Sequence, residues 1–229
     1  MIPKIIHYCW LSGDPIPENL ANYMKSWKEK LPDYKFMLWN FNRFDINSSI
    51  WVKEAFNAKK YAFAADYIRL FALYNYGGIY MDMDVEVIKP FDDMLDRKYL
   101  LAYEEKNRIE AGIMGSEPKA DWLKTCLDYY KDKSFYKKGD EMDCRPLPMI
   151  LNEIISDKFP SMQIMGTDVF TTKSMKTGKI NVSQNSYTIH HFAGSWCSWQ
   201  HKLKRKIYLL IAKNQFVFKL YNIVYKQHK

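Results

Sequence analysis

Apolar side chains follow two different rhythms in the stretch 61–88. In its first part they recur every three or four residues, which is the period of a helix with one buried face. In its second part apolar and polar side chains alternate, as they do along a strand with two unlike faces. Gly77 and Gly78 stand between the two parts, and glycine readily adopts the left-handed conformation in which many helices end. The pattern predicts a helix over 61–76, a sharp turn and a strand over 79–88.

The same rules divide the rest of the first 200 residues into short elements. Compact apolar runs predict strands over 4–11, 35–39 and 99–104. Helical spacing predicts helices over 17–30, 49–56, 119–130 and 146–158. The order strand, helix, strand, helix, acidic strand favours an α/β fold in which helices flank a mainly parallel central sheet.

The polar face of the predicted strand over 79–88 carries three acids, Asp82, Asp84 and Glu86. Carboxylates that share a cleft repel one another and lose hydration, so a cation is expected between them. Oxygen ligands of this kind suit Mn²⁺ or Mg²⁺. The alternative interpretation is that the acids form only the solvent face of an edge strand, because Asp-x-Asp alone is a common tripeptide.

Three further side chains are candidates for binding a ligand. Asp66 and Arg69 are neighbours on the predicted helix, spaced i and i+3, so they either pair with each other or hold one ligand together. Trp10 ends the first predicted strand, and ligands of open α/β sheets bind beyond the carboxyl ends of strands. Its indole is therefore expected either to stack on a nucleotide base or to join the core. His7, inside that strand, is expected to be a hydrogen-bonded core histidine.

A second polar group begins where a short apolar run ends in His190 and His191. Successive strand residues point to opposite faces, so only one imidazole can reach a metal or a diphosphate, and the pattern leaves open which one. The residues that follow, Gly194, Ser195 and Trp196, offer amide, hydroxyl and indole donors for phosphate oxygens. The alternative is a buried strand end whose histidines are satisfied within the core.

The segment 104–115, between the acidic strand and the two histidines, contains three acids followed by two glycines. Glu104, Glu105 and Glu110 are expected on a solvated surface, with a cleft for an acceptor substrate as the alternative. Gly112 and Gly115 have no side chain and would permit a ligand to approach the backbone closely.

Composition fits one folded domain with a basic tail. The 229 residues are 48% hydrophobic and 16% aromatic, and neither a glycine-serine linker nor an internal repeat divides them. We therefore expect a domain over 1–200 and a tail over 201–229. The tail holds eight Lys and Arg and no acid, which equals the formal net charge of +8, so the domain itself is balanced. This distribution does not indicate a nucleic-acid-binding surface.

The tail and the cysteines bear on where the protein works. Residues 202–228 combine helical apolar spacing with lysines, which is typical of an interfacial helix on an anionic membrane; the alternative is a closing helix packed on the domain. The four cysteines lie far apart and are expected to be free thiols. Without an apolar leader or a run long enough to span a membrane, a cytoplasmic protein is expected, peripheral on the inner face of the plasma membrane if the tail binds lipid.

The order Ala65-Asp66-x-x-Arg69, followed by Gly77-Gly78-Ile79-Tyr80-x-Asp82-x-Asp84, resembles the donor-binding core of glycosyltransferase family 32. Residues 2–10 and 187–196 are similar to the opening strand and the closing motif of the same family. That family includes bacterial capsule and polysaccharide sugar transferases, fungal mannosyltransferases and the glucosyltransferase domains of large clostridial toxins. The resemblance implies a nucleotide-sugar-binding fold of the GT-A type.

The resemblance also implies a reaction and a donor site. It implies metal-dependent, configuration-retaining transfer of a hexose from a nucleotide diphosphate sugar, with a UDP-sugar favoured and GDP-mannose as the alternative. The acceptor would be a saccharide or a glycolipid, in the synthesis of capsular or other cell-surface polysaccharide by a bacterium. Trp10 would stack on the donor base, Asp66 and Arg69 would hold ribose or sugar hydroxyls, and Tyr80 would line the same pocket.

The metal site and the leaving-group site are implied in the same way. Asp82 and Asp84 would bind Mn²⁺ or Mg²⁺ together with one of the two adjacent histidines, His190 or His191. The backbone and side chains of 194–196 would bind the departing diphosphate.

Two other functions share some of these features. A haloacid-dehalogenase-type phosphatase also uses Asp-x-Asp, but its motif lies on the opening strand and continues with Thr or Val where this chain has Glu86. A non-catalytic membrane-surface binding protein would carry the same acids in a structural role. Binding of Mn²⁺ and a nucleoside diphosphate separates the enzyme from this second alternative.

Overall fold

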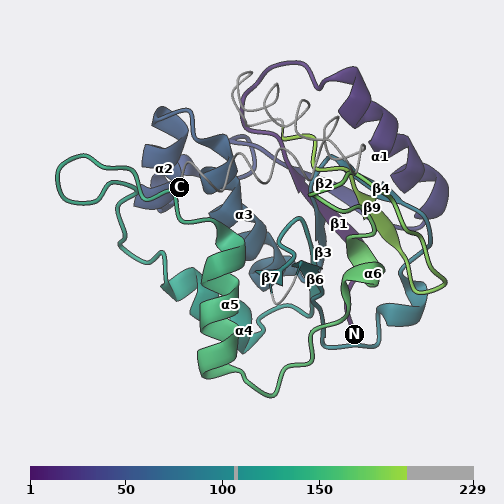
Figure 1. Cartoon of the computed structure of the whole chain (residues 1–229). Coiled ribbons are helices and arrows are strands. Elements are labelled where there is room, and N and C mark those ends of the chain that lie inside the picture. The colour runs from purple at the N-terminus through teal and green to yellow at the C-terminus, as the bar shows by residue number, and fades with distance from the viewer. Residues whose placement is uncertain (106–107, 195–229) are drawn as a thin grey trace, which may run out of the picture.

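The structure, a computed structural model, describes residues 1–105 and 108–194 (Figure 1). The predicted tail over 201–229, with Ser195 and Trp196 before it, lies outside these residues. Within the described part, no helix is both long enough and apolar enough to cross a lipid bilayer. The cysteines that are described are free thiols, as predicted.

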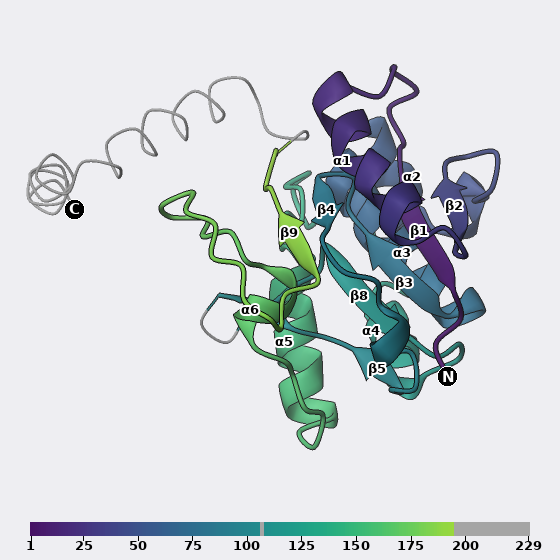
Figure 2. The ribbon, with the colours of Figure 1, turned by 90° about the vertical axis from the view of Figure 1, so that its right-hand side faces the viewer.

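A five-stranded sheet forms the centre of the molecule, in the order β2-β1-β3-β8-β5 (Figures 1 and 2). Its strands are β1 (Ile5–Cys9), β2 (Lys35–Trp39), β3 (Gly78–Met81), β5 (Tyr99–Leu100) and β8 (Ile113–Ser116). The first three run parallel, whereas β8 pairs antiparallel with both β3 and β5. A parallel neighbour needs a long crossover, usually a helix, and the described chain from β3 to β8 contains no α-helix. The predicted α/β class is confirmed, with a mixed sheet in place of a mainly parallel one.

Helices cover both faces of this sheet. One face carries α2 (Ile50–Asn57), α3 (Tyr61–Tyr76), α4 (Asp121–Asp128) and α5 (Leu147–Lys158). The other carries α1 (Glu18–Lys30) and the short α6 (Thr167–Phe170). Two 3₁₀ turns, η1 (Ile46–Ser48) and η2 (Asp92–Met94), lie in the connections. The five longer helices are those that the apolar spacing predicts, and they differ from the prediction by at most two residues at either end.

Two small antiparallel sheets stand beside the central one. β4 (Val85–Val87) pairs with β9 (Thr188–His190), and β6 (Tyr103–Glu105) pairs with β7 (Arg108–Ile109). The predicted strand over 99–104 is therefore divided between β5 and β6, which belong to different sheets.

Alternating side chains of the central sheet contribute to two separate cores. Ile79 and Met81 of β3 pack with Trp27 of α1 in one core, whereas Tyr80 between them packs with α3 in the other. Each of these four side chains is at most 1% exposed. The indole of Trp27 also donates to the carbonyl oxygen of Val85 (2.7 Å), which fastens α1 to β4.

The predicted strand over 79–88 is wrong as a single element. β3 ends at Met81, the next three residues make a turn in which the Val85 amide donates to the Asp82 carbonyl (3.1 Å), and β4 then joins a different sheet. Aspartate has low strand propensity and is common in turns, which accounts for a break at Asp82. The apolar side chains that alternate with the acids, Met81, Met83, Val85 and Val87, nevertheless lie in the core that contains Trp27 of α1, so the alternation predicted the buried face correctly.

The turn between α3 and β3 depends on two glycines. Gly77 and Gly78 have φ angles of +62° and +98°, in the left-handed region that other residues avoid. A Cβ atom on Gly77 would lie 2.7 Å from Cδ of Pro118, and one on Gly78 would lie 2.6 Å from the carbonyl oxygen of Ile5. The predicted helix end is confirmed, and it allows β3 to lie beside β1.

His7 is fully buried in β1, as predicted for a core histidine. Its Nε2 donates to the carbonyl oxygen of Gly77 (2.8 Å), and its Nδ1 accepts from the indole of Trp39 (3.0 Å). This pattern requires the neutral ring. Burial lowers the pKa of His7 to about 4, although the hydrogen bond to Gly77 acts in the opposite direction.

We expect His7 to make the fold less stable in mild acid. Unfolding restores an ordinary pKa near 6.5, so below that pH the unfolded chain binds a proton that the folded chain does not accept until about pH 4. The stabilising contribution is complete above pH 6.5, and by pH 5 it has declined by about 2 kcal/mol. Urea unfolding of the wild type and of His7→Phe at pH 7.5 and pH 5 measures this decline.

The His7→Phe variant lacks both hydrogen bonds and is expected to be the less stable protein at each pH. It has no proton to take up at this position, however. The difference in unfolding free energy between the two proteins should therefore narrow by about 2 kcal/mol from pH 7.5 to pH 5. A constant difference would contradict the assignment of a neutral His7.

Candidate active site

The connections of the central sheet change direction between β1 and β3. β1 is joined to β2 through α1 on one face, and β2 is joined to β3 through α2 and α3 on the other. In open α/β sheets such a reversal leaves a ligand crevice beyond the carboxyl ends of the strands at which it occurs, here β1 and β3. Trp10 follows β1 and Asp82 follows β3, so both lie at these carboxyl ends.

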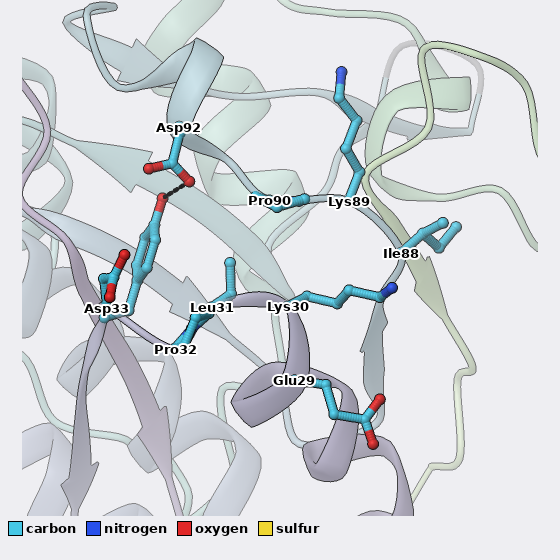
Figure 3. Close-up of a pocket in the computed structure, with 10 residues that line it drawn as sticks. Glu29, Lys30, Leu31, Pro32, Asp33, Ile88, Lys89, Pro90 and Asp92 are labelled. Atoms are coloured by element: carbon cyan, nitrogen blue, oxygen red, sulfur yellow. Dashed lines mark hydrogen bonds between the residues drawn. The ribbon is translucent and has the colours of Figure 1, made fainter.

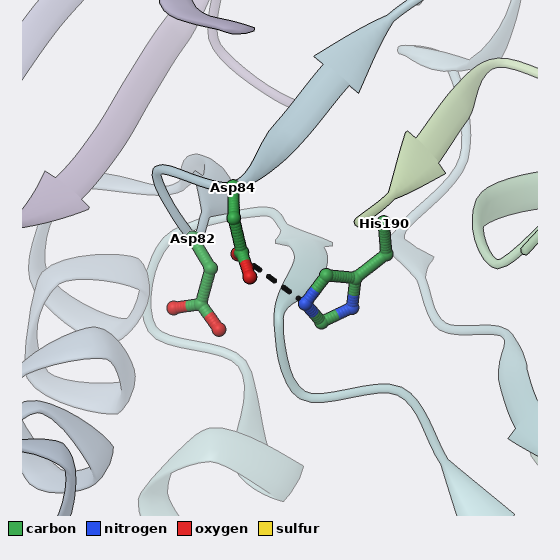
Figure 4. Close-up of side chains that lie close together, drawn as sticks. All are labelled: Asp82, Asp84 and His190. Carbon is green, nitrogen blue, oxygen red and sulfur yellow. Dashed lines mark ion pairs between the residues drawn. The ribbon is translucent and has the colours of Figure 1, made fainter. Parts of the chain in front are cut away.

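Three polar side chains converge beyond β3 from separate elements (Figure 4). Asp82 and Asp84 belong to the turn between β3 and β4, and His190 is the last residue of β9. One carboxylate oxygen of each aspartate and one ring nitrogen of His190 lie within 4.8 Å of one another. The antiparallel pairing of β4 with β9 sets Val85 opposite His190 and so brings the histidine to the aspartates.

Asp84 is held by the end of β9. Its Oδ1 lies 3.4 Å from Nε2 of His190, its Oδ2 accepts from the Ala193 amide (2.6 Å), and its carbonyl oxygen accepts from the His191 amide (2.9 Å). Burial would raise the pKa of Asp84, but the charge of His190 and the hydrogen bonds from His190 and Ala193 outweigh it and lower the pKa to about 2. Asp84 is therefore ionised throughout the physiological range.

Asp82 is held from the opposite side by β3 and α3. Its Oδ1 accepts from the Tyr80 hydroxyl (2.8 Å) and lies 3.4 Å from Nη2 of Arg69. Burial raises the pKa of Asp82, Arg69 lowers it, and the charge of Asp84 adds to the rise. The two aspartates of the cluster thus differ in their affinity for a proton, and the charge of Arg69 limits the rise in the pKa of Asp82.

Arg69 is the cation between two carboxylates. Its side chain is 7% exposed and contacts Asp66 (3.2 Å) as well as Asp82, and its Nη1 donates to the carbonyl oxygen of Ala111 (2.6 Å). Asp66 also accepts from the amide of Leu147 at the start of α5, where free amides and the helix dipole favour an anion. Of the two alternatives for Asp66 and Arg69, the structure contains the pair, which joins α5 to the cluster.

The two histidines point to opposite sides of β9, as predicted. His190 faces Asp84 and is 7% exposed, whereas Nε2 of His191 lies 2.8 Å from Oε2 of Glu86. The ring of His191 stacks on Tyr23 of α1, with 4.0 Å between the ring centres. His190 is therefore the histidine of the cluster. The ring of His191 joins α1 to β4 instead, and the assignment of metal ligands stays a prediction.

Glu110 is the residue of this site that the sequence analysis misses. Expected on a solvated surface, it is 1% exposed. Its Oε2 lies 3.0 Å from Nδ1 of His190 and accepts from the Thr171 hydroxyl (2.6 Å), and its Oε1 accepts from the Gly112 amide (2.6 Å). The surrounding sequence has no periodicity that marks a buried acid, and the only available signal is the small residues that follow it.

The other two acids of that segment differ from each other. The side chain of Glu104 is 7% exposed and pairs with Arg108, so the solvated surface is wrong for this residue as well. Burial and the charge of Glu110 raise the pKa of Glu104 to about 7. Glu105 is more open, with 31% of its side chain exposed near Lys176.

Gly112 makes room for the cluster itself. A Cβ atom at this position would lie 2.7 Å from Cε1 of His190, 2.9 Å from Oε1 of Glu110 and 3.0 Å from Oδ2 of Asp82. The Gly112 carbonyl oxygen also accepts from the Asp82 amide (2.7 Å). The sequence predicts that a ligand can approach the backbone at Gly112. In the structure the groups that approach it closely are the side chains of His190, Glu110 and Asp82.

The cluster fits a divalent cation. It offers carboxylate oxygens from two aspartates and one imidazole nitrogen, a donor set that suits Mn²⁺ and, through its oxygens, Mg²⁺. Burial would lower the pKa of His190, but Glu110 and Asp84 raise it well above 6.5. Because a ligand nitrogen must be deprotonated, binding of a metal at these residues releases a proton.

Of the other predicted donor residues, the structure describes Tyr80, Trp10 and Gly194. Tyr80 is 1% exposed and reaches the cluster through its hydroxyl. Trp10 is half-buried, and its indole donates to the carbonyl oxygen of Asp14 (2.6 Å). Gly194, with a φ angle of +59°, follows the residue whose amide binds Asp84. Their roles in donor binding stay predictions.

A hollow of about 470 Å³ opens elsewhere, between the end of α1 and the segment after β4 (Figure 3). Its lining, residues 29–34, 88–90 and 92, combines charged and apolar side chains, and the Tyr34 hydroxyl donates to Asp92 across it (3.4 Å). Asp84 precedes β4 and Ile88 follows it, so the hollow and the acidic cluster lie at opposite ends of that strand. The group of side chains that could hold a metal ion therefore lies at the cluster and not in this hollow.

A known protein family matches the part of the chain that contains the two aspartates of the cluster. The family described as the glycosyltransferase sugar-binding region containing a DXD motif matches residues 17–101. Inositol phosphoceramide mannosyltransferase 3 of Schizosaccharomyces pombe is 33% identical over 118 residues, which cover 50% of this chain and 33% of that protein. Mannosyl phosphorylinositol ceramide synthase CSH1 of Saccharomyces cerevisiae is 31% identical over 143 residues, which cover 61% of this chain and 37% of that protein. The chain thus spans about a third of the length of these curated relatives.

A solved structure is similar in fold. The PaToxG glycosyltransferase superposes with a TM-score of 0.54 and 17% sequence identity, over 71% of each chain. This similarity supports the predicted GT-A type architecture. The family match contains Asp66, Arg69 and both aspartates of the cluster but ends before His190, so the histidine is identified by the geometry alone.

Replacing Arg69 is expected to destabilise the fold strongly. Arg69→Met leaves the carboxylates of Asp66 and Asp82 without their shared cation, at a cost of about 3–5 kcal/mol in unfolding free energy. The matched control is Arg145→Met, because Arg145 pairs with the exposed Glu153 and its loss should cost less than about 1 kcal/mol. Urea unfolding at pH 7.5 compares the two variants. An equal loss of unfolding free energy in both would contradict the role of Arg69 as the cation that stabilises two buried carboxylates.

Proposed function

We propose that the chain, whose residues 17–101 match the glycosyltransferase sugar-binding region containing a DXD motif, transfers a hexose from a nucleotide diphosphate sugar to a hydroxyl group of a saccharide or lipid-linked acceptor. The observation that carries the proposal is the convergence of Asp82, Asp84 and His190 beyond the end of β3. Two acids of the motif and a histidine distant in sequence form one cluster, and it lies where open α/β sheets bind their ligands.

Asp82, Asp84 and His190 are the residues that would hold a divalent cation, Mn²⁺ or Mg²⁺. Bound there, the cation supplies Lewis-acid stabilisation of the charge on the departing diphosphate. The rest of the work belongs to the chain. Asp84 is ionised at neutral pH, while Arg69 and Tyr80 fix Oδ1 of Asp82, so the acidic groups are oriented before a substrate arrives.

The donor is proposed to lie between β1 and the segment after β9. Trp10, beyond the end of β1, would stack on the base. Gly194 follows the amide that anchors this segment on Asp84, and with Ser195 and Trp196 it would donate to phosphate oxygens. Asp66 and Arg69, both nearly buried, are proposed to act through Asp82 rather than on the sugar hydroxyls.

Retention of configuration is proposed from the family resemblance. In such a reaction a phosphate oxygen of the donor takes the proton of the acceptor hydroxyl, and no side-chain nucleophile is required. The task of the protein is then to align two substrates and to exclude water from the crevice.

The names of the relatives favour one donor sugar and one kind of acceptor. Both name a mannosyl group and a ceramide lipid. We therefore propose GDP-mannose as the first donor and a lipid-linked acceptor, with the UDP-sugars as the alternative. A lipid acceptor would agree with a peripheral position on the inner face of the plasma membrane through 202–228. A bacterial role in capsule or other cell-surface polysaccharide rests on the sequence resemblance.

A donor screen tests the enzyme proposal. The purified protein is incubated with Mn²⁺ and, singly, GDP-mannose, UDP-glucose, UDP-galactose and their N-acetyl forms, and release of the nucleoside diphosphate is measured. One donor should be hydrolysed slowly, because water replaces the missing acceptor. Asp84→Asn should lower this rate by more than about 100-fold through loss of a charged ligand. Glu86→Gln is the matched control, since Glu86 contacts His191 and lies outside the cluster.

Thermal unfolding gives an independent measure of binding. Mn²⁺ with GDP or UDP should raise the melting temperature of the wild type and of Glu86→Gln, but not that of Asp84→Asn. Hydrolysis should cease with EDTA and return with Mn²⁺. If no donor is hydrolysed and no nucleotide stabilises the fold, the non-catalytic binding protein becomes the better explanation.

A further inference from the structure

A buried carboxylate lies directly behind the histidine of the cluster, and the proposed mechanism does not use it. We propose that Glu110 is a positioning residue that keeps a proton on Nδ1 of His190, directs Nε2 toward Asp84, and so sets the affinity of the cluster for a divalent cation. The inference rests on the proposed function, because it requires a metal at the cluster. It assigns Glu110 no contact with either substrate.

Three contacts fix the ring of His190. Its Nδ1 lies 3.0 Å from Oε2 of Glu110, and its Nε2 lies 3.4 Å from Oδ1 of Asp84. The ring of Phe192 stacks against it, with 4.0 Å between the ring centres. A histidine ligand presents a lone pair at one nitrogen, and the hydrogen bond at the other nitrogen decides which one that is. With Nδ1 donating to Glu110, Nε2 is the nitrogen directed at the aspartates.

Glu110 is itself held in one orientation. The Thr171 hydroxyl donates to its Oε2 (2.6 Å) and the Gly112 amide donates to its Oε1 (2.6 Å), so both oxygens of this buried carboxylate are satisfied. Gly112 also accepts from the Asp82 amide through its carbonyl oxygen. Glu110 therefore connects the histidine to the segment that holds the first aspartate, and a shift of its carboxylate would move His190.

Glu104 separates the hydrogen bond from the effect of charge alone. Its side chain is nearly as buried as that of Glu110, and its charge acts on both Glu110 and His190. Its own partner is Arg108, however, whereas the carboxylate that contacts Nδ1 of His190 is that of Glu110. At pH 8, above the pKa of about 7 of Glu104, neutralising either acid removes negative charge near His190. Only the change at Glu110 alters the group that contacts the ring, because a glutamine has one oxygen for the three donors that the Glu110 carboxylate binds.

The test is the affinity of the full chain for Mn²⁺ alone, measured by electron paramagnetic resonance of the free ion. Glu110→Gln should weaken binding about 10–100-fold, as is usual for loss of the partner of a ligand histidine. Glu104→Gln should change it less than about 3-fold, since no contact to the ring is lost. Asp84→Asn should weaken it most. Urea unfolding of each variant identifies those that are folded under the conditions of the titration.

Two results would overturn the proposal for Glu110. One is equal Mn²⁺ affinity in the wild type and in folded Glu110→Gln. The other is an equal loss in both glutamine variants, which would make charge rather than the hydrogen bond responsible. A wild type that does not bind Mn²⁺ overturns the proposed function and this inference with it, and that result is seen before any variant is compared.

A second variant decides the matter if Glu110→Gln does not fold. Thr171→Val removes the hydroxyl that donates to Oε2 of Glu110 and keeps the shape of the side chain. It should weaken Mn²⁺ binding about 3–10-fold, because Glu110 is then held by one donor fewer. Unchanged affinity in Thr171→Val would overturn the positioning role.

Discussion

Repulsion between Asp82 and Asp84 is the constraint around which the site is built. Two carboxylates at the end of a buried strand are costly to hold together, and the cost falls only if donors and cations surround them. The chain supplies these from both sides: Arg69 and Tyr80 approach the first aspartate, and His190 with the amide of Ala193 approaches the second. Each group comes from a different element, so the charges fix how those elements pack.

The same requirement extends beyond the cluster. Arg69 also pairs with a second carboxylate, that of Asp66, and Asp66 accepts from a backbone amide in the first turn of α5. The ring of His190 contacts the carboxylate of Glu110. That carboxylate in turn accepts hydrogen bonds from the Thr171 hydroxyl and the Gly112 amide. Polar contacts thus lead outward from the cluster to α5 and to the segment after α6. The helix α5 on one face of the sheet and the segment after α6 on the other are therefore joined to the site by polar contacts as well as by apolar packing.

Features that depend on short-range pattern could be predicted from the sequence. The helix α3 with its glycine end, the strand that contains His7 and the pair Asp66–Arg69 each involve spacings of a few residues, within which periodicity is reliable. The proximity of Asp82 and Asp84 could be expected for the same reason. A break at Asp82 could not be predicted, because the alternation of buried apolar residues continues through it.

Features that depend on contacts between distant segments could not be predicted. The burial of Glu110 follows from Thr171 and His190, which come 61 and 80 residues later in the chain. The choice of His190 over His191 follows from the register in which β9 pairs with β4. No local pattern contains that register, so the sequence left both histidines open.

The pairing of β4 with β9 also imposes an order on biogenesis. Ala193 donates to Asp84 across 109 residues, whereas the helix that carries Arg69 ends immediately before β3. During translation the first strands and α3 can assemble while β9 is still being synthesised. The nascent chain can therefore gain a folded core well before it gains the histidine, and the cluster of two aspartates and one histidine is completed only after β9 has been synthesised.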